Sequence, residues 1–99
     1  MTTDDIDAEI EVESDLAVHP GEFLGEEIGE RGMTQRALAA SIERSAQVVN
    51  EIVRGKKSIT ADTALALEQA LGISARTWLN LQVDYDLTKA RQRRAAHVL

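Results

Sequence analysis

The chain has 99 residues, one proline, no cysteine and three aromatic residues, and 43% of it is hydrophobic. This length supports one small domain with a modest core and excludes a second one. Without cysteine there is no disulfide, thiolate zinc site, iron–sulfur cluster or cysteine nucleophile. The formal charge is -6, but seven acids and no Lys or Arg precede His19, which leaves ten of the 17 acids against all 11 bases. A local basic patch is therefore compatible with the acidic total.

Residues 1–18 differ in composition from the rest of the chain. They contain no Gly, Pro, Lys or Arg, and acidic and apolar residues alternate from Asp5 to Glu13. That period of two is typical of a strand with one charged face, although no other segment looks like a partner strand. Two interpretations stay open: a disordered acidic tail, or an arm that becomes ordered on a basic partner protein. No stretch approaches the roughly 18 apolar residues of a membrane span, so we expect a cytoplasmic protein with no membrane contact.

The first predicted helix begins at Pro20, a residue that suits the first helical position. Gly32 ends it. Its apolar stripe consists of Phe23, Leu24 and Ile28. Glycine also recurs every four residues inside it, which indicates either close contact with another helix or simple tolerance; the positions are Gly21, Gly25 and Gly29.

Four more helices are predicted, each beginning after a Ser or Thr that can cap it, namely Thr34, Ser45, Thr60 and Ser74. Gly55 and Gly72 end the third and fourth, and the fifth runs to about Arg94. The buried faces, in chain order, are Leu38, Ala39 and Ile42; Val49, Ile52 and Val53; Ala64, Leu67 and Leu71; and Trp78, Leu81, Gln82 and Tyr85. The fold class is therefore all-α, with no internal repeat.

The second and third helices are short and separated by about three residues, which is the spacing of a helix-turn-helix. With one side of the third helix buried, the opposite side carries Gln47, Asn50, Glu51 and Arg54. Amide side chains can contact adenine in a bidentate manner, and arginine can contact guanine or phosphate. Three bases follow within four residues, at Arg54, Lys56 and Lys57, where they would bind the DNA backbone.

Four short motifs carry a family resemblance: HPGE at residues 19–22, GKKSITADTAL at 55–65, WLNLQ at 78–82 and YDL at 85–87. With them, residues 19–87 closely resemble the HigA-type antitoxins, the Xre-like helix-turn-helix proteins of bacterial toxin–antitoxin modules. The resemblance implies a lambda-repressor-like five-helix domain over residues 19–88, between the acidic tail (1–18) and a basic helical extension (89–99). It further implies a homodimer that binds a palindromic operator in its own promoter and neutralises a RelE-like toxin that cleaves messenger RNA.

The resemblance also assigns roles by position. Gln35 is expected to contact a phosphate at the start of the second helix. The residues expected at or near the major groove are Ser45, Ala46, Gln47, Val48 and Asn50, and those expected on the DNA backbone are Arg54, Lys56 and Lys57. The core or the dimer contact is expected to use Trp78, Leu79, Leu81 and Tyr85.

This chain departs from the family pattern around the predicted turn. Glu43 and Arg44 stand where relatives usually have a glycine and an aliphatic residue, and Ala46 and Val48 replace a proline and an arginine. Glu43 must either adopt a left-handed conformation, at about 1 kcal/mol, or turn differently. Arg44 must leave the core or extend its charged end out of it. Val48 cannot make a bidentate base contact, although it can touch a thymine methyl.

Other function classes find little support in the sequence. His19 and His97 lie far apart, no His or acidic cluster has metal-ligand spacing, and the glycine-rich phosphate-binding pattern is absent, so we expect no enzyme, metal, cofactor or small-molecule substrate. Two alternatives to the repressor-antitoxin stay open. One is a pure toxin inhibitor that no longer reads DNA, and the other is a free-standing Xre-like regulator. The basic end, with Lys89, Arg91, Arg93 and Arg94, is expected to be solvated, to touch DNA or to pair with the acidic tail.

Overall fold

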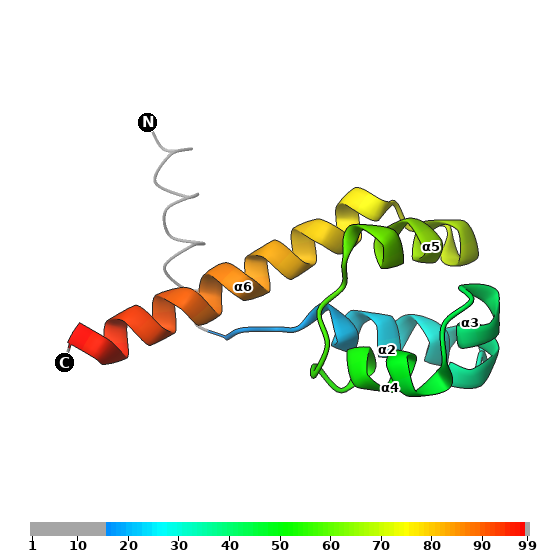
Figure 1. Ribbon diagram of the computed structural model, residues 1–99, viewed down its shortest axis with the longest axis horizontal. Coiled ribbons are helices and arrows are strands. Elements are labelled where there is room, and N and C mark those ends of the chain that lie inside the picture. The colour runs from blue at the N-terminus through cyan, green and yellow to red at the C-terminus, as the bar shows by residue number, and fades with distance from the viewer. Residues whose placement is uncertain (1–15, 99) are drawn as a thin grey trace.

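The computed structural model describes residues 16–98, and within them the chain forms five helices and no strand. The helices are α2 (Pro20–Glu30), α3 (Gln35–Ser41), α4 (Ala46–Val53), α5 (Ala61–Leu71) and α6 (Ala75–Val98) (Figure 1). This confirms the all-α prediction. The predicted acidic tail lies outside the described residues except for residues 16–18.

Local sequence signals fix where the helices begin. Each of the four predicted caps accepts a hydrogen bond from a backbone N–H in the first turn, at 3.0 to 3.3 Å; the caps are Thr34, Ser45, Thr60 and Ser74. These bonds satisfy N–H groups that have no partner within the helix. Helix α2 begins at Pro20 as predicted, but its cap is the imidazole of His19, whose Nδ1 accepts from the N–H of Gly21 at 2.8 Å.

The core lies where α4 packs on α2 and α3 and where α6 packs on α2 and α5. Trp78 is fully buried, and the Phe23 ring packs against it with the ring centroids 5.2 Å apart. The other buried apolar residues include all the predicted inner positions of α3 and α5. Four predicted inner positions are only half-buried, namely Phe23, Val53, Leu81 and Tyr85. Val53 lies at the edge of the contact between α2 and α4.

The glycines of α2 serve different purposes. A Cβ on Gly21 would overlap the carbonyl oxygen of Ile52, so the start of α2 can approach the end of α4 only with glycine there. A Cβ on Gly25 would meet Val53 at 3.4 Å, whereas one on Gly29 would meet nothing within 4 Å. Close contact therefore explains the first glycine, and tolerance explains the third.

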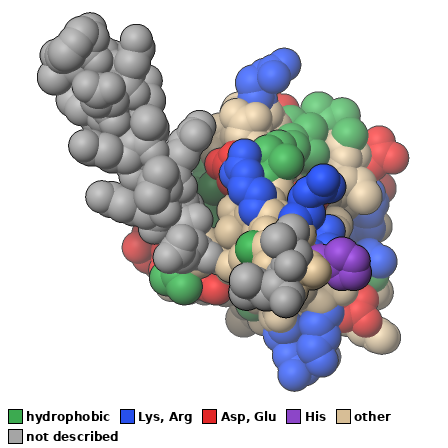
Figure 2. All heavy atoms as spheres, turned by 90° about the vertical axis from the view of Figure 1, so that its left-hand side faces the viewer, with side chains coloured by type: hydrophobic (Ala, Val, Ile, Leu, Met, Phe, Trp, Pro, Cys, Tyr) green, Lys and Arg blue, Asp and Glu red, His purple; other side chains and the backbone are tan. Residues whose placement is uncertain are grey.

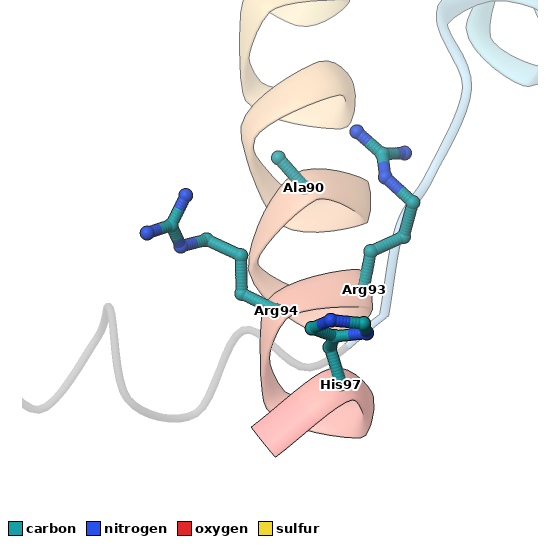
Figure 3. Close-up of a pocket in the computed structure, with 4 residues that line it drawn as sticks. All are labelled: Ala90, Arg93, Arg94 and His97. Carbon is teal, nitrogen blue, oxygen red and sulfur yellow. The ribbon is translucent and has the colours of Figure 1, made fainter.

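Helix α6 reaches Val98 rather than ending near Arg94, because no glycine or proline follows Gly72 and both Ala95 and Ala96 favour helix. Its C-terminal half projects beyond the other helices (Figure 1), and Lys and Arg side chains gather around that end (Figure 2). Ala90, Arg93, Arg94 and His97 line a shallow pocket of about 490 Å³ there, with the two guanidinium groups reaching out on opposite sides of the helix (Figure 3). Within residues 16–98, no helix is long and apolar enough to span a membrane.

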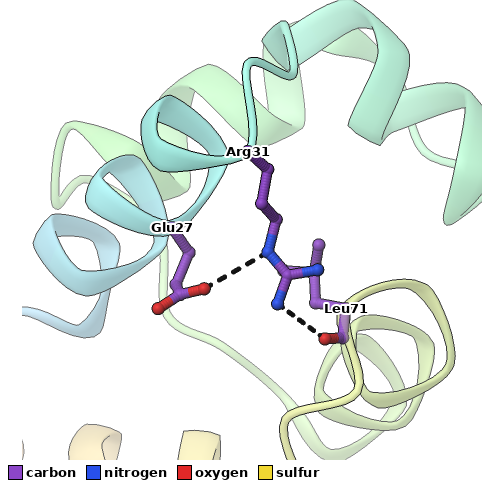
Figure 4. A network of polar contacts seen from close by, with 3 residues as sticks. All are labelled: Glu27, Arg31 and Leu71. Atoms are coloured by element: carbon purple, nitrogen blue, oxygen red, sulfur yellow. Dashed lines mark hydrogen bonds and ion pairs between the residues drawn. The ribbon is translucent and has the colours of Figure 1, made fainter.

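Arg31 joins the ends of α2 and α5 (Figure 4). Its Nη2 donates to the carbonyl of Leu71 at 2.8 Å, and its Nε pairs with Glu27 at 3.2 Å. The guanidinium thus satisfies a carbonyl that has no partner within the last turn of α5, where the helix dipole also favours a cation. This contact orients α5 against α2 from outside the core.

Candidate nucleic-acid interface

The turn between α3 and α4 has a left-handed residue at its centre. Glu43 adopts a φ of 56°, which confirms the first of the two predicted options. The N–H of Arg44 donates to the carbonyl of Ala39 at 3.0 Å, and that of Glu43 donates to Ala40 at 3.3 Å, which is the Schellman pattern that ends α3. The Arg44 side chain is half-buried, and its Nη1 donates to the Ile42 carbonyl at 3.3 Å. It therefore folds back over the turn and keeps its charge out of the core.

Helix α4 has one apolar and one polar side, as predicted. Val49 and Ile52 are buried, whereas Gln47 and Arg54 are exposed and Asn50 is half-buried. Two hydrogen bonds order the polar side chains. The Asn50 amide donates to Oε1 of Gln35 at 3.1 Å, which links the start of α3 to the middle of α4, and the Gln47 amide donates to Glu51 at 3.3 Å. Glu51 thus adds a negative charge beside the predicted reading residues.

The N-terminal end of α4 is accessible. Ser45 and Ala46 are exposed, and the Ser45 hydroxyl accepts from the N–H of Val48 at 3.1 Å. Val48 is half-buried and packs against the core, so only part of its side chain faces outward. The backbone N–H groups that remain at the start of a helix attract a phosphate.

The basic loop, residues 54–58, begins directly after α4. Gly55 has a φ of 78°, and the N–H groups of Lys56 and Gly55 donate to the carbonyls of Glu51 and Ile52 at 2.8 and 3.0 Å. This is again a Schellman motif, here with the glycine that usually occupies its left-handed position. Lys56 and Lys57 are exposed. Within residues 16–98 neither they nor Arg54 forms an ion pair.

Two buried side chains from other helices hold the basic loop. His19 packs on Gly55 and forms a hydrogen bond with the backbone of Lys57. Because that bond raises the pKa of the imidazole and Nδ1 already accepts from Gly21, the ring N–H is its donor and the Lys57 carbonyl its acceptor. Gln82 of α6 accepts through Oε1 from the N–H of Ile59, directly after the loop, at 2.8 Å, and its Nε2 lies 3.5 Å from the hydroxyl of Ser58 within it.

The fold favours the neutral form of His19. Burial lowers its pKa from the ordinary value of 6.5, and this outweighs Asp86, the Lys57 carbonyl and Glu22, which each raise it. Its ring also meets Tyr85 of α6 edge-on, with ring centroids 4.8 Å apart. The sequence placed His19 only at a helix start, because histidine is not a common cap and its contacts come from distant parts of the chain.

The positions predicted for the core or the dimer contact fall into two groups. Trp78 is fully buried and belongs to the core, whereas Leu79, Leu81 and Tyr85 are half-buried. The exposed apolar residues Val83 and Leu87 continue the row that begins at Leu79, at intervals of four residues.

Within residues 16–98 no group of three His, Cys or acidic residues could hold a metal ion.

Comparisons with known proteins identify a family and several similar proteins. Residues 24–78 match the helix-turn-helix family HTH_3. The chain is 48% identical over 77 residues to virulence-associated protein I of Dichelobacter nodosus, covering 77% of this chain and 71% of that protein.

The similar solved structures include two antitoxins that match over most of their length. One is a HigA-family addiction module antidote protein from Coxiella burnetii, with a TM-score of 0.77, 38% identity and coverage of 83% of this chain and 90% of that one. The other is the Pseudomonas aeruginosa antitoxin HigA with the higBA promoter, with a TM-score of 0.78, 37% identity and coverage of 84% and 91%.

Proposed function

Because the chain belongs to the helix-turn-helix family and, within it, to the HigA-type antitoxins, we propose that it binds an operator in its own promoter and represses its operon. The observation that carries this proposal is the surface of α4 and the basic loop. It presents Gln47, Asn50 and Arg54 beside Lys56 and Lys57, on the side of α4 opposite its buried residues. The similar Pseudomonas HigA was solved with its promoter.

In this proposal some of these residues contact the bases and others contact the DNA backbone. Gln47 and Asn50 read base edges in the major groove, and Arg54 contacts a guanine or a phosphate. Lys56 and Lys57 bind phosphates without regard to sequence. Gln35 contacts a further phosphate while its side-chain oxygen orients the Asn50 amide. Ser45 and Ala46 bring the start of α4 to the groove, and Val48 contributes apolar contact.

We further propose that the active form is a homodimer and that the second partner is a RelE-like, mRNA-cleaving toxin. A row of apolar side chains on α6 supports the dimer. Val83 and Leu87 are 51% and 46% exposed, and with the half-buried Leu79 they form one stripe that a second copy would cover. The proposal of a toxin partner is supported only by the chain's membership of the antitoxin family.

A competition gel shift tests operator binding. The purified protein is titrated against its own upstream region at a stated salt concentration, with scrambled DNA of equal length as the competitor. We expect the upstream region to be bound preferentially. Equal binding to both DNAs would overturn the proposed repressor function and favour the alternative, a protein that only inhibits a toxin.

A triple variant separates DNA reading from toxin neutralisation. Q47A/N50A/R54A should lose operator preference but still neutralise the toxin in co-expressing cells. The control is E68A/Q69A, which removes two exposed polar side chains of α5, outside both the surface of α4 and the apolar row of α6. It should bind the operator like the wild type. Loss of binding in the control as well would place the effect outside α4.

A further inference from the structure

The basic loop is anchored by side chains that cannot themselves contact DNA. Lys56 and Lys57 are exposed, whereas His19 and Gln82 are only 6% and 5% exposed. His19 reaches the loop from the start of α2 and donates to the Lys57 carbonyl. Gln82 reaches it from α6, where Oε1 accepts from the N–H of Ile59 at 2.8 Å and Nε2 lies 3.5 Å from the Ser58 hydroxyl.

Each anchor is itself held in place by α6. The His19 ring meets Tyr85 edge-on at an interplanar angle of 74°, and its Nδ1 accepts from Gly21. The Gln82 amide donates to Asp86 at 3.0 Å. Two adjacent turns of α6 therefore fix both side chains, and through them the backbone on either side of Ser58.

We propose that His19 and Gln82 are positioning residues for DNA binding. They hold the loop backbone so that Lys56 and Lys57 meet phosphates without first being ordered. This inference rests on the proposed operator binding. Its physical basis is entropic, since ordering a flexible loop and two long side chains on binding opposes association, and a loop already fixed avoids part of that loss.

His19→Asn separates loop positioning from helix capping. Asparagine is a favoured cap, so it retains an acceptor for the N–H of Gly21, but its side chain is too short to keep the contacts with both Lys57 and Tyr85. The matched control is Ser74→Asn, which exchanges the cap of α6, a residue that bonds only within its own helix start. Circular dichroism would verify folding, and Gln82→Met provides a second variant if His19→Asn unfolds.

The readout is operator affinity over a range of salt concentrations. For His19→Asn we expect affinity at 0.1 M salt to fall about tenfold and the slope of log affinity against log salt to shrink by roughly one to two, the contribution of one or two phosphates. Ser74→Asn should stay within about twofold of the wild type with an unchanged slope. An unchanged slope in His19→Asn would overturn the proposal.

A double-variant comparison is sharper still. If His19 acts through the loop, His19→Asn should cost nothing further once the lysines have been replaced in K56Q/K57Q. The same fold-loss in both backgrounds would show that His19 acts elsewhere and would contradict positioning.

Hydrogen exchange tests the anchor without DNA, so that failure of operator binding is distinguishable from failure of this inference. The N–H groups of Lys56 and Ile59 are bonded to Glu51 and Gln82. In His19→Asn they should exchange about tenfold faster while amides of α5 keep their rates. Unchanged exchange at both would overturn the proposal even if the wild type binds its operator.

Discussion

The two connections that flank α4 share a backbone motif but differ in the contacts that they receive from other helices. Both are Schellman motifs with a left-handed residue, Glu43 before the helix and Gly55 after it. The Gly55 loop touches α2 and α6 through His19 and Gln82. Glu43 is exposed, and the side-chain contact that supports its turn comes from the adjacent Arg44, which donates to the Ile42 carbonyl.

The difference shows that a left-handed conformation does not require glycine. At Glu43 the hydrogen bonds that end α3 and the packing of α3 on α4 impose the conformation, at a cost of about 1 kcal/mol. At Gly55 the residue itself permits it without that cost. The better supported connection is also the one that carries the basic residues, whereas the strained one leads into the N-terminal end of α4.

The largest expected effect is at Gly21, which lets α2 approach the turn that ends α4. Gly21→Ala would push a methyl group into the backbone carbonyl of Ile52, and we expect the free energy of unfolding to fall by about 3 kcal/mol. Urea unfolding measures it. Gly29→Ala is the control, because nothing lies within 4 Å of its Cβ position, and it should gain about 0.5 to 1 kcal/mol from helix propensity. Equal effects at both glycines would contradict the close contact.

The next effect is at Gly55. Its Cβ would meet His19 at an ordinary 3.6 Å, so the cost of Gly55→Ala comes from the backbone alone. We expect a loss of about 1 to 2 kcal/mol in the free energy of unfolding. A loss near zero would mean that the loop can change its geometry without penalty.

The reverse exchange at Glu43 should stabilise the protein. Glu43→Gly relieves the left-handed strain, and we expect a gain of about 1 kcal/mol, reduced somewhat by the greater freedom of glycine in the unfolded chain. The matched control is Glu68→Gly, an exposed position inside α5, which should lose about 1 kcal/mol. Destabilisation at Glu43 would show that its side chain contributes more than the strain costs.

The smallest expected effect is a pH dependence of the protein's stability, which His19 contributes where it packs on the basic loop. Because its pKa is lowered in the fold, the neutral form is favoured, and its contribution to stability is complete above its ordinary pKa of 6.5. That contribution is lost as the pH falls from 6.5 through the lowered value. Thermal unfolding at pH 7.5 and 5.5 should show a larger fall for the wild type than for His19→Asn, whose cap does not titrate. Equal falls would contradict this assignment.

Local signals were enough to predict most of the fold. The caps Thr34, Ser45 and Thr60 and the apolar periodicity gave the helix starts and inner faces, because these depend on residues within one or two turns. The end of α6 was placed too early, since nothing in the sequence stops it before Val98.

The candidate site was only partly predictable. The polar side of α4 follows from its period, but a bond that orders it and a bond that anchors the chain after the basic loop join positions far apart in the sequence. Asn50 bonds to Gln35 across 15 residues, and Gln82 bonds to Ile59 across 23. No periodicity encodes such pairs, and Gln82 read from the sequence only as an inner-face residue. The role of His19 and Gln82 in holding the basic loop could therefore be seen only in the structure.

A hydroxyl-radical footprint of the full chain on its own upstream region tests most directly whether α4 and the basic loop bind the operator. We expect two protected patches related by a two-fold axis, with centres about one helical turn of DNA apart. Each patch should shrink in K56Q/K57Q, because the basic loop would lie on the DNA backbone beside α4. Uniform protection along the DNA, or protection that K56Q/K57Q leaves unchanged, would contradict it.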